Sequence, residues 1–499
     1  MNLQDLLCGV SSEPIAPVPI AGLACHSKQV RAGDLFIAIE GSVMDGHAFI
    51  DEAIARGAAA IIAQRLPDRY RFGGHAPQIR ACPCVVVPDS RDALVKIATR
   101  FYGHPSRKLR LIGVTGTNGK TTTTYLLKSI LEHAGARVGL LGTIVYQIGS
   151  RVVPSTNTTP GPLELARYFA QMVGEGIEWC AMEVSSHALA QGRIEGLEFE
   201  AATFTNLGSD HLDYHKTREA YAAAKRRLFG YLRPQGIAVI NADDPFGRVL
   251  AETVPNHPVV SYAMEHPAKA KVRHVACSWQ GTELVLETPW GIVPITTPLL
   301  GRHNVPNVAA AATTLLALGV PPMAIREGLS TIVQVPGRLE QVTNDAELHI
   351  VIDYAHTADA LRLVLLSLRE LTRGRLIVAF GCGGNRDQTK RPVMGKMASL
   401  LADQVILTSD NPRGEDPLDI IHQIKGGFPP GFQQFEVIPD REQAIVTALA
   451  MARHNDTVLI AGKGHEAYQL FDHVSIPFSD QEIVTRWLDA RQGAALVSL

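Results

Sequence analysis

The stretch from Leu109 to Gly135 constrains the fold more than any other part of the sequence. An apolar run, LRLIGVTG (109–116), leads through a glycine-containing turn into KTTTTYLLKSILEHAG (120–135). In the second segment, apolar residues recur at the spacing of one helix face, and the segment closes on a glycine. These apolar residues are Leu126, Leu127, Ile130 and Leu131. The pattern predicts a buried strand, a tight glycine loop and a helix, the arrangement in which a loop binds phosphate.

Similar strand-like runs recur along the rest of the chain. They are WCAMEVSS (179–186), AATFTNLGSD (201–210), GIAVINADD (236–244), HIVIDYAH (349–356), RLIVAFGCGGNRD (375–387), QVILTSDNPR (404–413) and TVLIAGKGHE (457–466). Strands that alternate with helices favour an α/β fold with a mostly parallel sheet. The last four runs end in polar or glycine residues, and ligands of such sheets collect where the strands end. We therefore expect one site at one edge of a C-terminal sheet.

Length and turn residues divide the chain into three domains. At ~100–200 residues per domain, 499 residues correspond to about three domains. The polar, proline-containing segment GHPSRKLR (103–110) and the pair Pro336-Gly337 mark the boundaries. We predict three α/β domains, at 1–106, 107–336 and 337–499.

Composition excludes several partners and compartments. The formal net charge is −2 and the sequence has no polybasic tract, so we expect no nucleic-acid partner. No run approaches the ~18 apolar residues of a membrane span, and MNLQDLLCGVSSEP lacks the features of a signal peptide. The seven scattered cysteines indicate reduced thiols rather than a disulfide framework or a zinc site. We expect a cytoplasmic monomer with no membrane span.

The glycine loop departs from the general phosphate-loop pattern at one position. That pattern has a glycine, four further residues and then Gly-Lys-Ser/Thr. Counted back from Gly119, the first glycine should stand at position 114, where the chain has Val114. The chemistry is retained, because Gly116 permits close backbone approach, Lys120 reaches the phosphates and the Thr121 hydroxyl ligates Mg²⁺. The shorter glycine interval argues against the commonest GTPases and kinases.

The segment Thr115–Thr122 resembles the ATP loop of the Mur ligases, ATP-dependent enzymes that form the amide bonds of the peptidoglycan stem peptide. Five further stretches follow in the order typical of that family. They are Glu183-Val184-Ser185-Ser186-His187, Thr205-Asn206-Leu207 with Asp210-His211-Leu212-Asp213, Gly301-Arg302-His303-Asn304 with Asn307, Pro336-Gly337-Arg338-Leu339-Glu340, and Asp353-Tyr354-Ala355-His356-Thr357. The resemblance implies an N-terminal α/β UDP-binding domain, a central P-loop ATPase domain and a C-terminal Rossmann-like domain.

The resemblance also implies which residues bind the nucleotide substrates. It assigns ATP to Gly116, Thr117, Asn118, Gly119, Lys120, Thr121, Thr122, Asn304, Arg338 and Asp353. It assigns UDP-MurNAc-L-Ala-D-Glu to Ser27, Asn157, Thr158, Thr159, Ser185, Gln191 and Arg193. Relatives often have Asp-Ser-Arg around the serine, whereas this chain has His26-Ser27-Lys28, so only Ser27 is carried over.

Asp410-Asn411-Pro412-Arg413 resembles the motif that accompanies meso-diaminopimelate, whose second carboxylate lysine lacks. Arginine presents a planar fork that matches a carboxylate, so Arg413 predicts a site that rejects lysine. The resemblance assigns Arg386, Asp410, Asn411, Pro412, Arg413, Gly462 and Glu466 to this amino acid, with Glu466 taking its distal ammonium. Read without the family, the Asn-Pro pair predicts a turn after a strand, but a turn does not explain Arg413.

Amide synthesis from a carboxylate requires an activated acyl group. In this family the carboxylate attacks the γ-phosphate of ATP, and the amine then attacks the acyl phosphate. The resemblance makes Lys120, Glu183, His211 and Lys225 catalytic, and Thr121, Glu183, His211 and the carbamate of Lys225 ligands of Mg²⁺. Carbamylation of Lys225 to N6-carboxylysine requires an amine without its proton, which burial favours. Read alone, Lys225 matches a solvated lysine and the cluster Asp210, His211, Asp213 and His215 matches a solvated loop.

The sequence leaves three alternative functions. A lysine-adding Mur ligase is disfavoured by Arg413. A folylpolyglutamate synthase has a similar ATP loop but lacks the N-terminal UDP-sugar domain and the DNPR stretch. From a different class, a P-loop ATPase switch has nucleotide-driven conformational change as its output. Phosphate release that depends on both an acceptor and an amino acid distinguishes a ligase from a switch.

Overall fold

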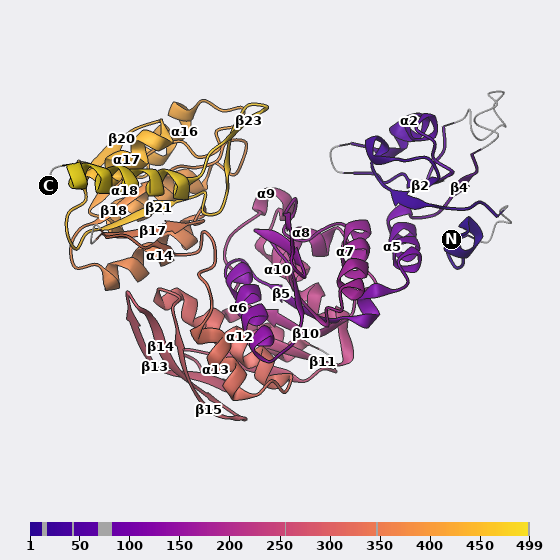
Figure 1. Ribbon diagram of the computed structural model, residues 1–499, viewed down its shortest axis with the longest axis horizontal. Coiled ribbons are helices and arrows are strands. Elements are labelled where there is room, and N and C mark those ends of the chain that lie inside the picture. Colours follow the sequence, from indigo (N-terminus) through magenta and orange to yellow (C-terminus); the bar gives the residue numbers. More distant parts are fainter. Residues whose placement is uncertain (12–16, 42–43, 68–81, 255, 346–347, 498–499) are drawn as a thin grey trace. The chain divides into compact units, whose positions relative to one another are not determined.

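The structure is a computed structural model that describes residues 1–11, 17–41, 44–67, 82–254, 256–345 and 348–497 (Figure 1). The chain forms two compact units. One comprises Met1–Gly113, Ala136–Ala202 and Ala224–Gly236, and the other comprises Val114–Gly135, Thr203–Ala223 and Ile237–Leu499. Four elements pass from one unit into the other, namely β5 (Arg110–Thr115), β10 (Phe199–Phe204), α10 (Arg218–Arg226) and β11 (Leu232–Asn241).

The N-terminal part of the first unit is a small parallel sheet with a hydrophobic core on each face. Its strands lie in the order β1 (Gly22–Ala24), β2 (Asp34–Ile37), β3 (Ala60–Ala63), β4 (Cys84–Val86). In β2, Leu35 and Ile37 pack into the core that contains α1 (Leu3–Leu6) and α5 (Ser90–Phe101). Phe36 packs on the opposite face with α2 (Ile50–Ala55). Burial on both faces explains the continuous apolar runs of these strands. Three 3₁₀ helices lie nearby, η1 (Ser27–Gln29), η2 (Gly46–Phe49) and η3 (Pro105–Lys108).

The first unit also contains one end of the central sheet. Strands β6 (Val138–Leu141) and β9 (Trp179–Glu183) pair in parallel, whereas β6 pairs antiparallel with β7 (Val145–Ile148) and β7 with β8 (Arg151–Pro154). The helices here are α7 (Pro162–Gly174), α8 (Ser186–Ala190) and the 3₁₀ helix η4 (Arg227–Tyr231). Because β9 ends at Glu183, the acidic motif lies at the carboxyl end of a buried strand.

The second unit contains the other end of the central sheet. Strand β11 pairs in parallel with β12 (Val259–Ala263) and β12 with β13 (Ala270–Ser278), and the chain then forms an antiparallel ribbon with β14 (Gly281–Thr288) and β15 (Gly291–Thr297). Helix α6 (Lys120–His133) packs against α12 (Val305–Ala317) and α13 (Pro322–Ser330). The unit also contains α9 (Leu212–His215), α11 (Pro245–Thr253) and η5 (Arg302–Asn304).

The central sheet is mixed. Its eleven strands have the order β15-β14-β13-β12-β11-β10-β5-β9-β6-β7-β8. The parallel part predicted from the sequence therefore carries an antiparallel ribbon at each end, β6–β8 and β13–β15. In β15, buried Val293, Ile295 and Thr297 alternate with exposed residues, which is typical of a strand with one solvated face.

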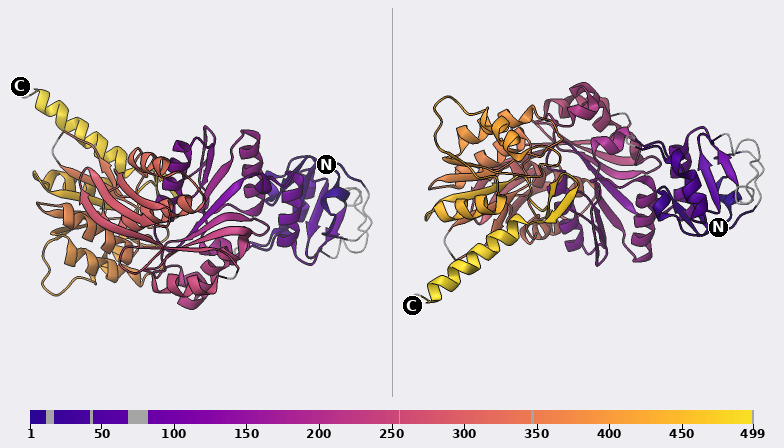
Figure 2. Two further views of the ribbon diagram at one scale, coloured as in Figure 1. Left: turned by 90° about the horizontal axis from the view of Figure 1, so that it is seen from below. Right: turned by 90° about the horizontal axis from the view of Figure 1, so that it is seen from above.

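The C-terminal sheet is a doubly wound, Rossmann-like sheet. Its six strands have the order β16 (Glu340–Val342), β17 (His349–Asp353), β21 (Thr457–Ala461), β18 (Leu376–Phe380), β19 (Gln404–Leu407), β20 (Phe435–Val437). All neighbours are parallel except β16 and β17. Helices α14 (Ala358–Leu371), α15 (Lys390–Leu401) and α16 (Pro417–Lys425) cover one face. Helices α17 (Arg441–Met451) and α18 (Asp480–Val497) cover the other, and α18 extends beyond the sheet (Figure 2).

The strands of this sheet end at a common edge. The register pairs Ala461 with both Asp353 and Phe380, and it pairs Phe380 with Leu407. The polar segments that follow β17, β18, β19 and β21 therefore leave the sheet on the same side, as the sequence predicted. The hairpin β22 (Tyr468–Phe471) and β23 (Val474–Pro477) joins this edge through a hydrogen bond of 2.9 Å from Arg413 N to Leu470 O.

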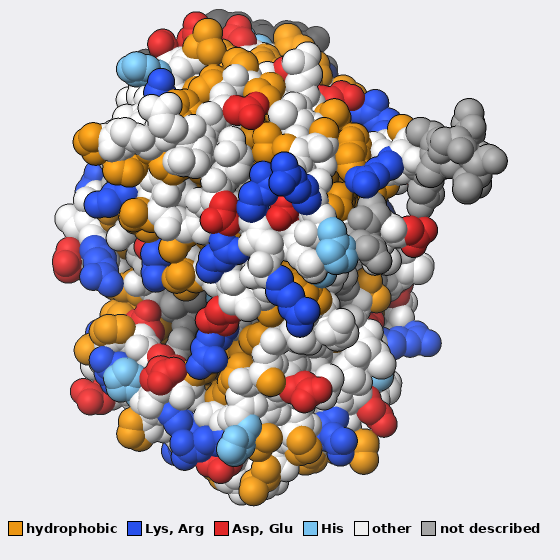
Figure 3. All heavy atoms as spheres, turned by 90° about the vertical axis from the view of Figure 1, so that its left-hand side faces the viewer, with side chains coloured by type: hydrophobic (Ala, Val, Ile, Leu, Met, Phe, Trp, Pro, Cys, Tyr) orange, Lys and Arg blue, Asp and Glu red, His pale blue; other side chains and the backbone are white. Residues whose placement is uncertain are grey.

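The surface carries both signs of charge. On the face shown in Figure 3, Lys and Arg side chains lie among Asp and Glu side chains, in agreement with the small net charge of −2. Within the described part of the chain, no helix is both long enough and apolar enough to cross a membrane.

Candidate active site

The phosphate loop is a four-residue connection between β5 and α6. Strand β5 ends at Thr115 and α6 begins at Lys120, with Gly119 as its N-cap. Gly116 and Gly119 have φ values of 156° and 86°, which lie in the region that favours glycine. Val114, where a general phosphate loop has glycine, is a fully buried residue of β5. Position 114 therefore still belongs to the strand, where glycine is not needed, and the glycines of the loop begin at Gly116.

The segment after β10 holds this loop in shape. The Asn206 carbonyl accepts from Thr117 N at 2.8 Å, and the Asn206 side chain accepts from Asn118 N at 2.9 Å. The Thr205 hydroxyl donates to Asn118 O at 2.6 Å. Lys120 Nζ donates to the carbonyl oxygens of Gly116 (2.9 Å) and Thr117 (2.8 Å), so its ammonium lies over the loop. The Lys120 ammonium and the N-terminus of α6 thus place positive potential at the loop, which is the arrangement typical of phosphate-binding loops.

The loop glycines also fit closely against neighbouring side chains. A Cβ atom on Gly119 would lie 2.1 Å from Asn307 Oδ1, and one on Gly116 would lie 1.8 Å from Thr205 Oγ1. Asn307 is held in turn by Asn304, whose Oδ1 accepts from Asn307 Nδ2 at 3.0 Å. The loop is therefore a preformed cradle in which any larger residue displaces its supports.

Arg338 brings the start of the C-terminal region to the phosphate loop within the second unit. Its Nη2 donates to Thr121 Oγ1 at 3.2 Å, and its guanidinium lies 4.7 Å from the centre of the Tyr354 ring. Asp353 accepts from Leu339 N and Ala355 N, both at 2.7 Å, and so fixes the backbone directly after Arg338 and directly after Tyr354. The structure thus brings together three residues that the sequence assigned to ATP, namely Lys120, Thr121 and Arg338.

His211 lies in a loop beside Asp210. Its φ is 55°, and its backbone N–H donates to Asp210 Oδ1 at 2.9 Å. Burial tends to raise the pKa of Asp210, but the charges of His211, His356 and Lys120 lower it below its usual range. Asp210 is thus a carboxylate near the phosphate-loop lysine. Read without the family, the cluster around Asp210 and His211 predicts a solvated loop. Asp213 is exposed, as a solvated loop requires, whereas His215 is buried.

Glu183 is the centre of a polar cluster in the first unit. It is 1% exposed, and its two carboxylate oxygens accept from Thr143 N (2.8 Å) and Thr143 Oγ1 (3.1 Å). The Thr143 hydroxyl also contacts the Thr158 hydroxyl at 3.0 Å. Thr159 Oγ1 donates to the Glu183 carbonyl at 2.9 Å, and Ser185 N donates to Thr159 Oγ1 at 3.0 Å. Segments 157–159 and 183–185 therefore lie together, which brings the catalytic assignment Glu183 next to residues assigned to UDP-MurNAc-L-Ala-D-Glu.

Arg193 completes this cluster. Its Nη1 donates to Thr159 O at 2.8 Å and its Nε donates to Gln191 Oε1 at 2.9 Å. The Asn157 backbone is fixed by Tyr146, whose hydroxyl accepts from Asn157 N at 2.9 Å. Ser27 lies instead in η1 of the N-terminal sheet, where its hydroxyl donates to Glu52 Oε2 at 2.8 Å.

Lys225 is a buried residue of α10, with an exposed fraction of 1%. This burial excludes the interpretation, made from Lys225 without the family, that the side chain is solvated. Glu183 and Lys225 belong to the first unit, whereas Thr121 and His211 belong to the second. Taken one by one, Thr121 carries a hydroxyl oxygen and Glu183 carries carboxylate oxygens, which Mg²⁺ prefers, a carbamate on Lys225 would add two more oxygens, and His211 offers an imidazole nitrogen. Among the described residues, no group of three or more His, Cys, Asp and Glu side chains is arranged to hold a metal ion.

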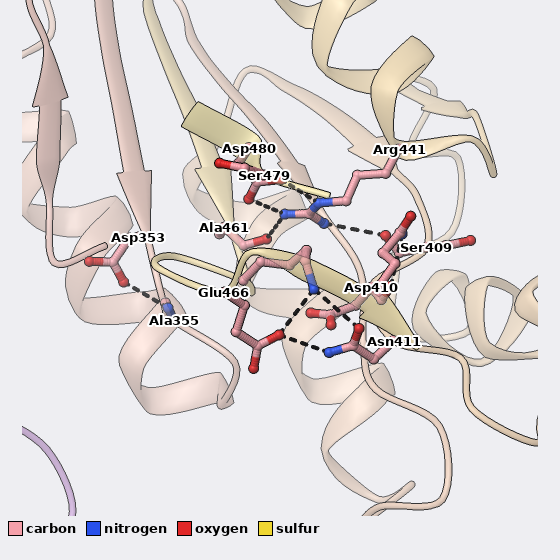
Figure 4. A network of polar contacts seen from close by, with 12 residues as sticks. Asp353, Ala355, Ser409, Asp410, Asn411, Arg441, Ala461, Glu466, Ser479 and Asp480 are labelled. Atoms are coloured by element: carbon pink, nitrogen blue, oxygen red, sulfur yellow. Dashed lines mark hydrogen bonds and ion pairs between the residues drawn. The ribbon is translucent and has the colours of Figure 1, made fainter. Parts of the chain in front are cut away.

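The residues assigned to diaminopimelate, here called the candidate amino-acid site, lie at the common edge of the C-terminal sheet (Figure 4). Asn411 Nδ2 donates to Glu466 Oε2 at 2.8 Å, which joins the segment after β19 to the segment after β21. Asp410 lies beside Gly462, since a Cβ there would be 2.7 Å from Asp410 Oδ2, and Gly462 has a φ of 111°. Four residues assigned to diaminopimelate from separate parts of the sequence are thus in one place.

Arg413 lies on the same site in a left-handed conformation, with a φ of 52°. Its Nη1 donates to Gly384 O at 3.0 Å and to Asn411 O at 3.4 Å. The guanidinium is therefore oriented by backbone carbonyls rather than by a carboxylate of the protein. Arg386, on the neighbouring loop, is exposed and donates weakly to Asn385 O at 3.5 Å.

Lys463 is a member of this site that the sequence interpretation missed. It is fully buried, and its Nζ donates to Asn411 Oδ1 (3.1 Å) and Glu466 Oε2 (3.0 Å). The signal was present in GKGHE, where a lysine stands between two glycines after a buried strand. Burial, together with the charges of Arg338 and Lys463, lowers the pKa of the nearby His465 to about 4, so this histidine is neutral at pH 7.

Three family models match the chain. They are the Mur ligase family catalytic domain at 19–102, the Mur ligase middle domain at 114–315 and the Mur ligase, glutamate ligase domain at 337–464. A UDP-N-acetylmuramoyl-L-alanyl-D-glutamate--2,6-diaminopimelate ligase from Gloeobacter violaceus is 44% identical over 495 residues, which are 99% of each chain. A solved structure of a ligase of the same name matches with a TM-score of 0.69 and 33% identity over 99% of each chain. MurF from Thermotoga maritima, solved in complex with ADP, shares the fold, with a TM-score of 0.65 and 21% identity over 96% of this chain and 100% of its own.

The fold and the glycine loop define a three-domain P-loop ligase, with a phosphate cradle on the central sheet and a candidate amino-acid site on the C-terminal one. The chain belongs to the Mur ligase family. The match over 99% of each chain includes the N-terminal domain and the DNPR segment, the two features that distinguish this chain from a folylpolyglutamate synthase.

Proposed function

We propose that this chain is an ATP-dependent ligase that adds meso-diaminopimelate to UDP-MurNAc-L-Ala-D-Glu in peptidoglycan precursor synthesis. The observation that carries the proposal is the amino-acid site, where Arg413, Asn411 and Glu466 lie together at the edge of the sheet. A carboxylate and a guanidinium in one site match an amino acid that carries both an ammonium and a carboxylate at its distal end. The name of the relative that is 44% identical supports the same substrate.

The proposed reaction has two steps, phosphoryl transfer from ATP and attack by the amine. An oxygen of the D-glutamate carboxylate attacks the γ-phosphorus of ATP, the bond from phosphorus to the bridging oxygen breaks, and ADP leaves. The neutral amine of diaminopimelate then attacks the acyl carbon, phosphate leaves, and the amine nitrogen loses a proton. The product is an amide, and the net reaction consumes one ATP.

The phosphate loop and its lysine stabilise the charge that develops on the transferred group. Lys120 lies over the loop, and backbone N–H groups and the N-terminus of α6 add positive potential without reorganisation during the reaction. Mg²⁺, when bound, neutralises phosphate oxygens. We assign its ligation to Thr121, Glu183, His211 and carbamylated Lys225. Thr143 orients the Glu183 carboxylate from two directions.

The substrates also determine where the enzyme acts. ATP and a UDP-linked precursor place the reaction in the cytoplasm, upstream of cell-wall assembly, cell shape and cell division. We also propose that the enzyme acts as a monomer. Neither nucleic acid nor membrane enters the reaction.

The experiment that tests the function measures phosphate release with ATP, UDP-MurNAc-L-Ala-D-Glu and one amino acid at a time. We expect release that requires both the acceptor and diaminopimelate, with lysine used at least about a hundredfold less efficiently in kcat/KM, since an unpaired arginine penalises lysine. Equal use of lysine would refute the substrate assignment. Phosphate release that needs neither acceptor nor amino acid would indicate an ATPase switch instead.

A further inference from the structure

Behind the amino-acid site, Arg441 and Asp480 form a fully enclosed ion pair (Figure 4). Both side chains have exposed fractions of 0%, and the pairing is bidentate. Arg441 Nε donates to Asp480 Oδ1 and Nη2 donates to Asp480 Oδ2, both at 2.8 Å. Neither residue is solvent-accessible, so neither contacts the substrate from this position.

The remaining donors of Arg441 bind the backbone at the two strands that lead into the site. Nη1 donates to Ser409 O at 3.3 Å, and Nη2 donates to Ala461 O at 3.0 Å. Ser409 directly precedes Asp410 of the DNPR segment, and Ala461 directly precedes Gly462. One guanidinium thus fixes the points from which both halves of the amino-acid site leave the sheet.

The ion pair also ties these points to two helices. Arg441 is the first residue of α17 and Asp480 is the first residue of α18, the two helices on the face of the sheet away from α14, α15 and α16. Burial tends to lower the pKa of Arg441, but Asp480, with smaller contributions from Asp410 and Glu466, raises it above its ordinary value. The guanidinium therefore stays charged, and it adds positive potential behind the two acidic groups of the site.

Stability alone does not account for this arrangement. A buried ion pair is often no more stabilising than apolar residues of the same volume, because desolvation offsets the attraction between the charges. Apolar residues, however, cannot donate to two carbonyl groups at fixed positions. The arrangement is specific in that the planar fork of arginine binds a carboxylate and two separate backbone segments at once.

We propose that Arg441 and Asp480 are positioning residues for the amino-acid substrate, which set the separation between the Asp410–Arg413 segment and the Gly462–Glu466 segment. The inference rests on the proposed function and concerns its specificity. The residues act through Asn411, Arg413 and Glu466, which contact the substrate. The site geometry therefore depends on the start of the last helix.

The test compares Arg441→Lys and Asp480→Asn with the wild-type full-length chain. Lysine keeps the charge but cannot reach the carboxylate and both carbonyls, and asparagine keeps the shape but weakens the pairing. We expect KM for diaminopimelate to rise about tenfold or more, as loss of one charge-assisted hydrogen bond implies. KM for ATP and for UDP-MurNAc-L-Ala-D-Glu should change less than about twofold, since the phosphate loop and the Glu183 cluster do not contact this pair.

A second ion pair between the same helices supplies the matched control. Arg486 Nη2 donates to Glu442 Oε1 at 2.9 Å on the surface of α18 and α17, with side chains 64% and 49% exposed. Glu442→Gln and Arg486→Ala should leave all three KM values unchanged. Hydrogen exchange should show faster exchange in 405–413 and 457–466 in Arg441→Lys, but not in Glu442→Gln.

Three results would overturn the proposal. They are an unchanged KM for diaminopimelate in both core variants, an equal rise in all three KM values, or failure of both core variants and of Asp480→Glu to fold at 25 °C. The last result would make the pair a stability element only. If the wild-type enzyme does not use diaminopimelate at all, the proposed function fails, irrespective of the variants.

Discussion

At the scale of single residues, Arg413 carries most of the expected substrate specificity. Its backbone is held in a left-handed conformation by the β22–β23 hairpin, and its guanidinium is oriented by the carbonyls of Gly384 and Asn411. The guanidinium is thus fixed before the substrate arrives, so little side-chain entropy is lost on binding. Lysine at this position would keep the positive charge but would lack the planar fork that matches a carboxylate.

Arg413→Lys is therefore expected to raise KM for diaminopimelate by about tenfold to a hundredfold, because a bidentate pair becomes a single contact. KM for ATP should stay within about twofold. Steady-state phosphate release at varied concentrations of each substrate measures both values. Arg486→Lys is a suitable comparison, since the Arg486 side chain is 64% exposed on α18 and is not assigned to the site. A change in KM for ATP as large as that for diaminopimelate would contradict the assignment.

Lys225 is expected to act as a carbamate. Lys225→Ala should lose at least about a hundredfold in kcat, and small carboxylic acids should partly restore the activity, because a missing anion is replaced from solution. Intact mass measured with and without bicarbonate reports the modification directly. Full activity of the unrescued variant would remove Lys225 from the mechanism. A matched control is Arg226→Ala, the exposed neighbour on the same helix.

His303 links stability to pH. Burial lowers its pKa from 6.5 to about 4, and its Nδ1 lies 2.8 Å from Ser367 Oγ of α14. Between those pH values the unfolded state binds more protons than the folded state, so the free energy of unfolding falls as the pH falls from 6.5 to 4. The loss should be about 1–3 kcal/mol.

Urea unfolding of the wild type and of His303→Asn at pH 7 and pH 4.5 measures this contribution. The variant should lose less stability on acidification, since asparagine keeps a polar contact to Ser367 but does not titrate. His473→Asn, at a position whose side chain is 94% exposed, should behave as the wild type does. If His303→Asn and the wild type lose equal stability, His303 is not the titrating group.

At the scale of elements, the loop between β5 and α6 depends on the conformation of its glycines. Gly119→Ala should abolish most ATP binding, because a Cβ would lie 2.1 Å from Asn307 Oδ1 at a φ of 86°. Gly135→Ala, beyond the other end of α6, has nearly the same φ of 84° but no atom within 4 Å of its Cβ. It should cost only the strain, about 1 kcal/mol of stability, and should leave ATP affinity unchanged.

Titration of a fluorescent ATP analogue distinguishes the two glycine variants. Equal losses of affinity would show that strain rather than the Asn307 contact controls the loop. The comparison separates backbone conformation from side-chain packing, which both contribute at Gly119.

The elements themselves were largely predictable. Buried strands such as β5, β17 and β21 have apolar runs bounded by glycine or polar residues, and α6 has clear helical spacing. The antiparallel ribbon β13–β15 was not predicted. Its apolar residues alternate with polar ones, which is a weaker signal than a continuous apolar run, and β15 contains Pro294. The candidate site residues were assigned through short motifs, and the structure brings several of them together. Lys463 and the Arg441–Asp480 pair were missed, since their roles arise from contacts between distant parts of the chain.

At the scale of the whole molecule, the middle and C-terminal family regions of the second unit are joined by an aromatic contact. The Trp279 ring, in the β13–β14 turn, stacks on His349 with centroids 3.8 Å apart and planes within 2°. Trp279 Nε1 also donates to Leu371 O at the end of α14, at 3.1 Å. This contact supplements the chain connection between the two regions.

Trp279→Ala should lower the free energy of unfolding by about 1–3 kcal/mol, through lost apolar contact and the lost hydrogen bond. It should also separate the unfolding of the C-terminal region from that of the rest, which calorimetry detects as a broadened or split transition. Trp290→Ala, in the β14–β15 turn of the same ribbon and 41% exposed, is the control. Equal effects of the two variants would show that the stack does not join the regions.

The supports of the phosphate loop have a kinetic consequence for folding. The contact from Asn118 N to Asn206 Oδ1 spans 88 residues of sequence. The phosphate loop can therefore reach its binding conformation only after β10 has paired in the central sheet. Such long-range pairing is slow, because it closes a long stretch of chain. The nucleotide is then a ligand of the native state alone. It cannot guide the chain toward that state, but once bound it lengthens the lifetime of the folded enzyme.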